Sequence, residues 1–329
     1  MSEQDLDLEL ESIKAELDAM DAHQAQSHAM PKKKKKKNKV FGRIVYFCLL
    51  AVFASIFLYC AKYITDYVTE SKEQADYYDD LSNLVNQHRP PVTDPTYTLP
   101  TVPENTEPSG TTPEGTEPEG TEPSTPVEPT EPPAPTEPTI LPEYQAIYEM
   151  NNHLVGWIRI PGTKVDYPVV QSPENPNFYL NHSFDKKWSS GGCIYAREKC
   201  DVFTPSDNIV LYGHHMKNGS MFATLDKYKK KSFWQDHQTF SFDTLYERHT
   251  YQIIAVFKTS ANAGAGFSYH LFDSADSKEE FDAFMEEVHK LQFYDTGITA
   301  EYGDMLLTLS TCEYTLDNGR FVVIAKRIS

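Results

Sequence analysis

The sequence predicts a mostly β domain in residues 143–329, with seven or eight short strands accompanied by helices. Short β-type runs follow one another there, and turn signals such as Pro161-Gly162 and Asn318-Gly319 separate them. The expected strands are residues 155–160, 167–170, 192–195, 208–212, 250–258, 305–312 and 321–326. This pattern suggests a closed β-barrel with helices outside it, but a β-sandwich would give a similar count, and periodicity does not choose between them.

Two helices are expected within this domain. The first opens it at residues 142–152. The second is inserted before the last two strands, in the segment SKEEFDAFMEEVHKLQ, with Ser277 as a candidate N-cap. Four apolar residues recur there at the spacing of one helix face: Phe281, Phe284, Val288 and Leu291.

A membrane anchor is expected at residues 44–61, which contain no charged side chain. A cleaved signal peptide is the weaker alternative, because the apolar stretch is long and no small-residue cleavage site follows it. The lysine run at 32–37, with Lys39 and Arg43, predicts by the positive-inside rule that residues 1–43 are cytoplasmic and the rest lies outside. A nuclear-localisation role for this run is the minor alternative.

The first thirty residues are acidic and predict a short cytoplasmic helix. Leu10, Ile13, Leu17 and Met20 alternate at spacings of three and four. The stripe is too short to indicate a coiled coil, so a solvated helix and a partner-binding helix remain equally open. We assign it no function.

Residues 62–89 predict a polar stalk, and residues 90–142 a disordered tether rich in Pro, Thr and Glu. Between Pro90 and Leu141 there are ten acidic residues, Asp94 and nine Glu, and no Lys or Arg. Much of the formal net charge of −18 therefore belongs to the tether. The folded part is only mildly acidic, which argues against nucleic acid as a partner.

Three cysteines lie outside the apolar segment that holds Cys48 and Cys60: Cys193, Cys200 and Cys312. An odd number in an exported domain leaves at least one thiol unpaired. The spacing of Cys193 and Cys200 leaves both a disulfide and two inert buried thiols open.

Cys312 and Arg320 flank one loop in MLLTLSTCEYTLDNGRFVVIAKR. Alternation places Ser310 and Cys312 on one strand face, and Asn318-Gly319 turns the chain into the next strand. Facing positions of a hairpin lie about 5 Å apart, so the guanidinium can sit beside the sulfur or beside an oxyanion formed on it. A nearby cation favours a nucleophilic thiolate. The alternative is a buried strand-end Cys and a solvated Arg.

His214 and His215 emerge where the apolar run of NIVLYGHHMKNGSMF ends. A thiol nucleophile needs a base or acid within hydrogen-bond reach, and imidazole suits neutral pH. Two exposed loop histidines are the plain alternative. A metal site is not expected, because no third ligand stands at a recognised spacing.

Together these motifs resemble the sortases, particularly class B. The resemblance rests on YGHHMKNGSMF, on TLSTC with an Arg eight residues after the Cys, and on GWIRIPGTKVDYPVVQ with NPNFYL. It covers roughly residues 143–328 and implies the closed barrel. It further implies Cys312 as nucleophile, with His214 and Arg320 as catalytic partners, and gives His215 no role. Ser310 and Thr311 become candidate substrate contacts, although a packing role for Ser310 is equally open.

The resemblance implies a cysteine transpeptidase that needs no cofactor and no metal. Its expected partners are secreted proteins with a C-terminal sorting motif, a peptidoglycan-precursor or pilin amine as acceptor, and the membrane of a Gram-positive type envelope. Cys312 would form a thioacyl intermediate, His214 would exchange protons with the two amines, and Arg320 would hold the substrate backbone or the oxyanion. A tethered cysteine hydrolase, a pilin-polymerising sortase and a noncatalytic surface-binding module are the alternatives.

Overall fold

The computed structural model describes residues 11–20, 39–90, 138–262 and 264–329. Leu10, the lysine run at 32–37 and most of the expected tether, residues 91–137, lie outside the described residues. Residues 11–20 are helical, as expected, and Ile13, Leu17 and Met20 are exposed. The chain divides into two compact units, Met1–Thr65 and Asp66–Ser329, and each is described by itself.

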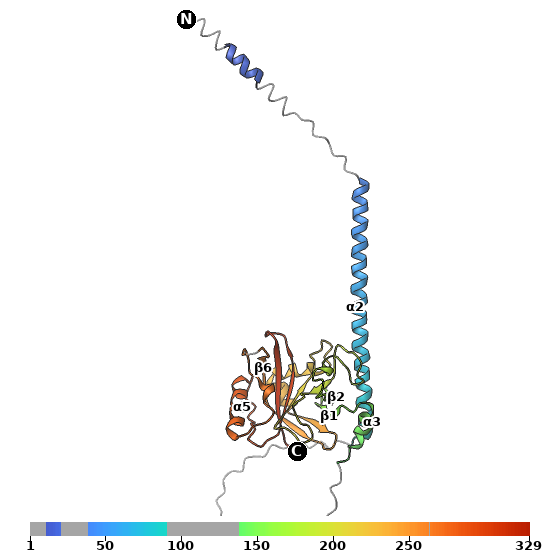
Figure 1. The fold of residues 1–329 in the computed structure, drawn as a ribbon, viewed down its shortest axis with the longest axis vertical. Helices are drawn as coiled ribbons and strands as arrows, with labels where there is room; N and C mark the ends of the chain where they lie inside the picture. Colours follow the sequence, from blue (N-terminus) through green and yellow to red (C-terminus); the bar gives the residue numbers. More distant parts are fainter. Residues whose placement is uncertain (1–10, 21–38, 91–137, 263) are drawn as a thin grey trace, which may run out of the picture. The chain divides into compact units, whose positions relative to one another are not determined.

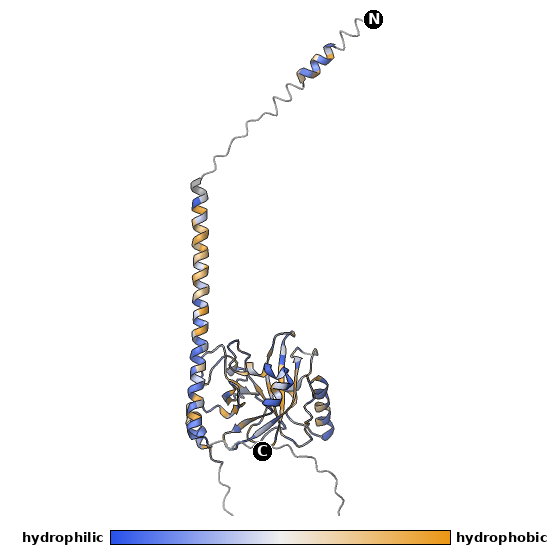
Figure 2. Ribbon diagram, turned by 180° about the vertical axis from the view of Figure 1, so that it is seen from behind, coloured by the Kyte–Doolittle hydropathy of each residue, from blue (hydrophilic) through white to orange (hydrophobic). Residues whose placement is uncertain are grey.

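In the first unit, the expected span forms part of helix α2 (Lys39–His88). Its apolar side chains from Ile44 to Tyr59 are exposed. Figure 2 shows this stretch of α2 as mainly hydrophobic, whereas later turns mix hydrophilic and hydrophobic residues. The helix is long and apolar enough to cross a membrane, which is compatible with a single membrane anchor.

The second unit is a closed barrel of eight strands in the order β1-β2-β3-β4-β7-β8-β6-β5. The strands are β1 (Leu154–Arg159), β2 (Asp166–Val170), β3 (Ile194–Ala196), β4 (Asn208–Tyr212), β5 (Thr239–Thr244), β6 (Thr250–Ser260), β7 (Leu306–Glu313) and β8 (Gly319–Arg327). Closure leaves no unpaired sheet edge, and it excludes the sandwich alternative. Aromatic side chains such as Trp157, Phe242, Phe257 and Phe321 are fully buried in its core.

One strand of this barrel, β5, was absent from the expected set. Its sequence TFSFDT alternates, and Phe240 and Phe242 are buried. β5 pairs with both β1 and β6, so it closes the barrel. The other expected strands are present, with ends that differ by a few residues.

The expected helices are present as α3 (Pro142–Met150) and α5 (Lys278–Leu291). Ser277 caps α5 as expected, because its side chain accepts a hydrogen bond from the Glu280 amide. Figure 1 shows α5 on the side of the barrel opposite α3 and the last turns of α2. The sequence did not predict a short helix, α4 (Lys231–Asp236), or the 3-10 turns η1 (Phe178–Leu180), η2 (Phe222–Lys229) and η3 (Tyr269–Leu271).

The expected polar stalk, residues 62–89, is corrected by the structure. From Asp66 onward α2 belongs to the same compact unit as the barrel. Tyr78, Leu81 and Val85 follow one another at spacings of three and four, and all three are buried in the core. These three apolar residues share one helix face, so this part of α2 packs on the barrel although its other residues are mostly polar.

This docking moves the start of the folded domain from residue 143 to Asp66. The part of α2 from Asp66 onward and the whole of α3 belong to that unit, so residues 91–137 connect two of its elements. From the sequence, these residues were expected between the polar stalk and the domain. Only residues 62–65 separate the span at 44–61 from the domain along the chain.

Candidate active site

Cys312 and Arg320 are direct cross-strand partners at the facing ends of β7 and β8. The hairpin register pairs Ser310 with Val322 and Glu313 with Gly319, so the expected arrangement of this segment is confirmed. Asn318 is the last loop residue before β8. Its φ is 47°, a left-handed conformation that Asn tolerates better than most residues. Cys312 and Arg320 are both partly exposed.

His214 reaches the same place through the pairing of two strands far apart in sequence. β4 and β7 are parallel, with Tyr212 opposite Ser310, and the Gly213 amide donates to the Ser310 carbonyl at 3.1 Å. Parallel strands end at the same edge, so the residue after Gly213 lies beside the end of β7. Gly213 has no space for a side chain, because a Cβ there would lie 2.4 Å from Ile194 Cδ1.

The His214 ring is held by a backbone carbonyl. Its Nε2 atom lies 2.8 Å from the carbonyl oxygen of Leu180, which ends η1. A carbonyl oxygen only accepts, so Nε2 carries the hydrogen of this bond. Nδ1 is therefore the ring nitrogen available to take up or release a proton.

His215, to which the family resemblance assigned no role, contacts the backbone of Cys312. Its Nδ1 atom lies 3.1 Å from the Cys312 carbonyl oxygen and donates to it. The Tyr314 hydroxyl donates to the His215 carbonyl at 3.2 Å, and the two rings lie 5.4 Å apart. His215 thus joins the loop after β4 to the end of β7. No sequence motif indicated this contact, because it depends on where the two loops meet.

Arg320 is oriented by its own turn. Its Nη1 atom donates to the Asn318 carbonyl at 3.2 Å, the Asn318 side-chain oxygen at 3.0 Å and the Gly319 carbonyl at 2.9 Å. These bonds use one nitrogen of the guanidinium. The other two nitrogens of the planar guanidinium carry N–H groups that can also donate hydrogen bonds.

Ser310 and Thr311 are both buried next to Cys312. The Ser310 hydroxyl lies 2.6 Å from the hydroxyl of Tyr269, so Ser310 has a packing partner in η3. Burial raises the pKa of Tyr269 to about 12, which keeps it a neutral hydrogen-bonding group. Within the described residues, Thr311 Oγ1 is buried without a hydrogen-bond partner.

One cavity of about 550 Å³ is lined by all five catalytic and substrate-contact candidates from the sequence. His214, Ser310, Thr311, Cys312 and Arg320 line it together with Leu180, Tyr195, Arg197, Glu198, Lys199, Tyr212, Tyr269 and His270. Burial, then the positive charges of Arg197 and Arg320, lower the pKa of His270. The cavity wall therefore holds a neutral imidazole beside fixed cations near neutral pH.

Glu313 follows Cys312 and is buried as a carboxylate. Its oxygens accept hydrogen bonds from the Thr315 amide and hydroxyl and from the Leu316 amide, at 2.8–3.1 Å. Burial would raise the pKa of this carboxyl. The hydrogen bonds from Thr315 and the charges of Lys258 and Lys229 outweigh burial, so the pKa lies below its ordinary value.

The other two cysteines of the barrel are free, buried thiols. Cys193 Sγ faces the Pro168 carbonyl, and Cys200 Sγ faces the Asn208 carbonyl. Burial raises the pKa of Cys193 to about 12 and also raises that of Cys200. Cys312 is the partly exposed thiol of this unit. Among the described residues, no group of three or more His, Cys, Asp or Glu side chains is placed to hold a metal ion.

Known proteins are similar to this chain in fold and in sequence. Residues 158–328 match the model of the Sortase domain family. Sortase B of Listeria monocytogenes is 30% identical over 189 residues, 57% of this chain and 74% of that protein. Sortase B of Staphylococcus aureus is 29% identical over 191 residues, 57% of this chain and 76% of that protein. The solved Staphylococcus aureus sortase B-substrate complex has a TM-score of 0.53 at 28% identity, covering 58% of this chain and 87% of that one.

The fold and these matches define a sortase, and the chain belongs to the sortase family. Within that family it is a class B sortase, as its relatives from Listeria monocytogenes and Staphylococcus aureus are. Sortases are cysteine transpeptidases, so this protein is an enzyme of that kind.

Proposed function

We propose that the protein cleaves a C-terminal sorting motif of exported proteins and transfers the new carboxyl end to an amine of the cell envelope. Cys312 is the nucleophile, His214 the acid and base, and Arg320 the cation that holds the substrate. One observation carries this proposal: His214, Cys312 and Arg320, from the ends of three strands, line one cavity. The Staphylococcus aureus relative solved with a substrate supports the same class of substrate.

In the first step the Cys312 thiolate attacks the backbone carbonyl carbon of a Thr in the sorting motif. The tetrahedral oxyanion accepts hydrogen bonds from Arg320. The scissile carbon–nitrogen bond then breaks, a thioester with Cys312 remains, and the leaving amine takes a proton from protonated His214. The Leu180 carbonyl occupies Nε2, so Nδ1 delivers that proton.

In the second step an acceptor amine attacks the thioester. Neutral His214 takes the amine proton at Nδ1, a new amide bond forms, and the Cys312 thiolate leaves. No redox change or cofactor enters either step. The acceptor is a cell-wall precursor peptide, and a pilin amine is the alternative that the same chemistry would serve.

Substrate positioning falls to Thr311 and Ser310. Thr311 Oγ1 is a buried hydroxyl beside the nucleophile, and a substrate amide or carbonyl would satisfy its hydrogen bond. Ser310 is engaged with Tyr269 and shapes the cavity wall. The apolar part of α2 anchors the enzyme as a single span, with its N-terminus cytoplasmic and the catalytic domain extracellular.

Peptide cleavage in the presence and absence of an amine tests this function. The full-length protein in detergent micelles is incubated with a quenched fluorescent peptide carrying a Pro-Thr sorting motif, with and without triglycine. We expect ligated product only with triglycine, and no product from Cys312→Ala. The matched control is Cys200→Ala, which removes a buried thiol outside the cavity. Hydrolysed product alone, unchanged by triglycine, would identify a hydrolase instead.

A further inference from the structure

The loop that carries His214 touches helix α2 at its tip. This histidine loop, residues 213–221, leaves β4 and returns at η2. Its base is closed by a bridge between His215 and Met221 and by the Phe222 amide, which donates to the His214 carbonyl at 2.9 Å. Asn218 lies at the tip, three residues before Met221.

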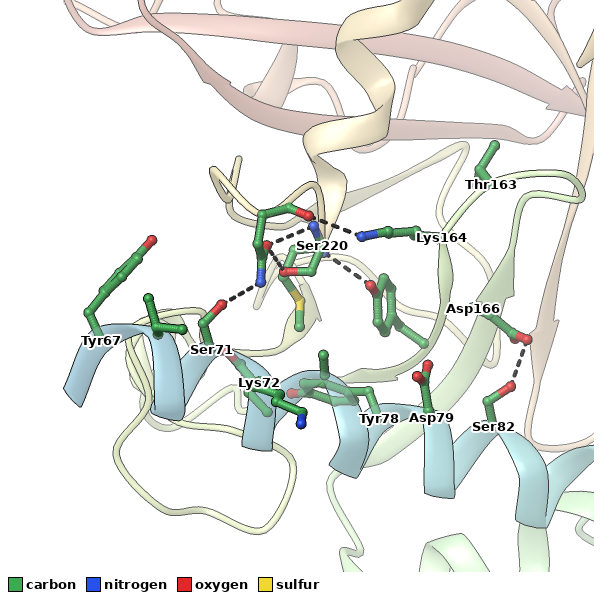
Figure 3. A pocket seen from close by; sticks show the side chains of 16 residues that line it. Tyr67, Ser71, Lys72, Tyr78, Asp79, Ser82, Thr163, Lys164, Asp166 and Ser220 are labelled. Atoms are coloured by element: carbon green, nitrogen blue, oxygen red, sulfur yellow. Dashed lines mark hydrogen bonds between the residues drawn. The ribbon is translucent and has the colours of Figure 1, made fainter. Parts of the chain in front are cut away.

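Asn218 is bonded from three directions. Its Nδ2 atom donates to Ser71 Oγ on α2 at 2.5 Å, and its carbonyl accepts from Lys164 Nζ at 3.0 Å. Its side-chain oxygen accepts from the Ser220 amide at 2.9 Å and the Ser220 hydroxyl at 2.6 Å. Figure 3 shows these bonds as dashed lines that end at the labelled residues Ser71, Lys164 and Ser220. The four residues joined by these bonds line a cleft of about 680 Å³ between α2 and the loop.

The same helix also supports the carbonyl that holds the His214 ring. Gln74 Nε2 and the Tyr78 hydroxyl both donate to the Gly192 carbonyl, at 3.0 and 2.8 Å. Gly192 has a φ of 57°, and a Cβ there would lie 2.6 Å from the Leu180 carbonyl oxygen. The Gly192 backbone is therefore packed directly against the atom that accepts the hydrogen bond of His214.

Ser71, Gln74 and Tyr78 lie on one face of α2, because they are three and four residues apart. Ser71 contacts the loop that carries the His214 backbone, and Gln74 and Tyr78 contact the segment that orients its ring. The two supports thus meet on about two turns of one helix. Errors of about 1 Å in the placement of a reacting group can cost about a hundredfold in rate, so such supports act on catalysis.

We propose that Ser71 and Asn218 are positioning residues for His214, and that α2, beyond its packing contribution, fixes the geometry of proton transfer. The proposal rests on the proposed role of His214. It makes the helix that continues from the membrane span a working part of the active site. Undocking of these turns of α2 would lower turnover even with the barrel intact.

Kinetics of three single variants of the full-length protein in detergent test the proposal. We expect Ser71→Ala and Asn218→Ala each to lower kcat about tenfold while KM changes by less than about twofold, because the substrate cavity is untouched. Both substitutions remove the bond between Ser71 and Asn218, so the double variant should have about the same kcat as Asn218→Ala alone. Ser71→Thr, which keeps the hydroxyl, should restore most of kcat.

Ser82→Ala is the matched control. Ser82 is half-buried on the same helix and donates to Asp166 at 2.7 Å, away from the histidine loop. Figure 3 shows this second bond at a distance from Ser71 along α2. Ser82→Ala should leave kcat within about twofold of the wild type. An equal loss of kcat in Ser71→Ala and Ser82→Ala would overturn the proposal.

Hydrogen exchange separates this proposal from the proposed function. We expect amides of residues 213–222 to exchange about tenfold faster in Ser71→Ala than in Ser82→Ala. If the wild type cleaves no sorting peptide, the proposed function fails and exchange alone decides the positioning. Equal exchange in both variants would then overturn it.

Discussion

The imidazole of His215 donates a hydrogen bond of 3.1 Å to the carbonyl oxygen of Cys312, so the two neighbouring histidines have different tasks. His214 lines the cavity and keeps Nδ1 free of the Leu180 carbonyl, whereas His215 holds the backbone of Cys312. The end of β7 is thereby held by its hairpin partner Arg320 on one side and by the histidine loop on the other.

His215→Ala should lower kcat about tenfold, because the Cys312 backbone loses a lateral support while the nucleophile itself remains. The matched control is His237→Ala. His237 is also half-buried, faces the Phe233 carbonyl through Nδ1 at 3.0 Å and stacks on the Phe233 ring, whereas the Nδ1 atom of His215 faces the Cys312 carbonyl. Peptide-cleavage kinetics of both variants provide the measurement. A similar loss of kcat in the two would show that the His215 contact has no catalytic consequence.

Arg320→Lys should lower kcat about a hundredfold, since an ammonium keeps the charge but loses the planar fork of donors. Arg327→Lys, at the opposite end of β8, is the control and should keep kcat within about twofold. Full activity of Arg320→Lys would mean that charge alone is required and that the guanidinium geometry is not.

Glu313→Gln should destabilise the barrel by about 1–3 kcal/mol at pH 7, because a buried carboxylate loses charge-assisted hydrogen bonds. The folded pKa of Glu313 is lowered, so its contribution is present above the unfolded pKa of about 4.3 and is lost as pH falls through the folded pKa. The difference between the variant and the wild type should therefore shrink below about pH 4. Urea unfolding at several pH values measures it.

The control for this pH series is Glu149→Gln, on the exposed side of α3. It should change the free energy of unfolding by less than about 0.5 kcal/mol throughout. A difference for Glu313→Gln that stays constant down to the lowest pH would contradict the assigned charge state.

Leu81→Ala should destabilise the domain by about 2–4 kcal/mol, because Leu81 on α2 is buried in the core. Val68→Ala, on an exposed position of the same helix, should cost less than about 0.5 kcal/mol. Tryptophan fluorescence during urea unfolding reports on this unit, which contains all three tryptophans. Equal stability of the two variants would restore the earlier interpretation of residues 62–89 as a stalk.

The hairpin of the candidate site could be predicted from sequence because its signals are local. Asn318-Gly319 specifies a tight return, and strand alternation then sets Cys312 opposite Arg320. The inserted helix was predictable for the same reason, from Ser277 and the spacing of its apolar residues. The position of His214 beside them came from the family resemblance, since parallel pairing of β4 with β7 joins segments about a hundred residues apart and no local pattern encodes it.

Three features could not be predicted from the sequence, and each has a physical reason. The Leu180 carbonyl that orients His214 is a backbone atom, and any residue type supplies one. The role of His215 depends on the meeting of two loops. The docking of α2 rests on Tyr78, Leu81 and Val85, whose spacing is helical but whose neighbours are polar. That composition resembles a solvated stalk until the barrel surface that receives these side chains is known.

Mass spectrometry of the acyl-enzyme tests the central claim most directly. The full-length protein is mixed with a Pro-Thr sorting peptide in the absence of an acceptor amine, quenched in acid and digested. We predict that the N-terminal part of the peptide is attached to Cys312 through a thioester that triglycine removes, and that His214→Ala accumulates at least about a hundredfold less of it. Peptide cleavage that proceeds in Cys312→Ala, or an adduct on any other residue, would contradict the account.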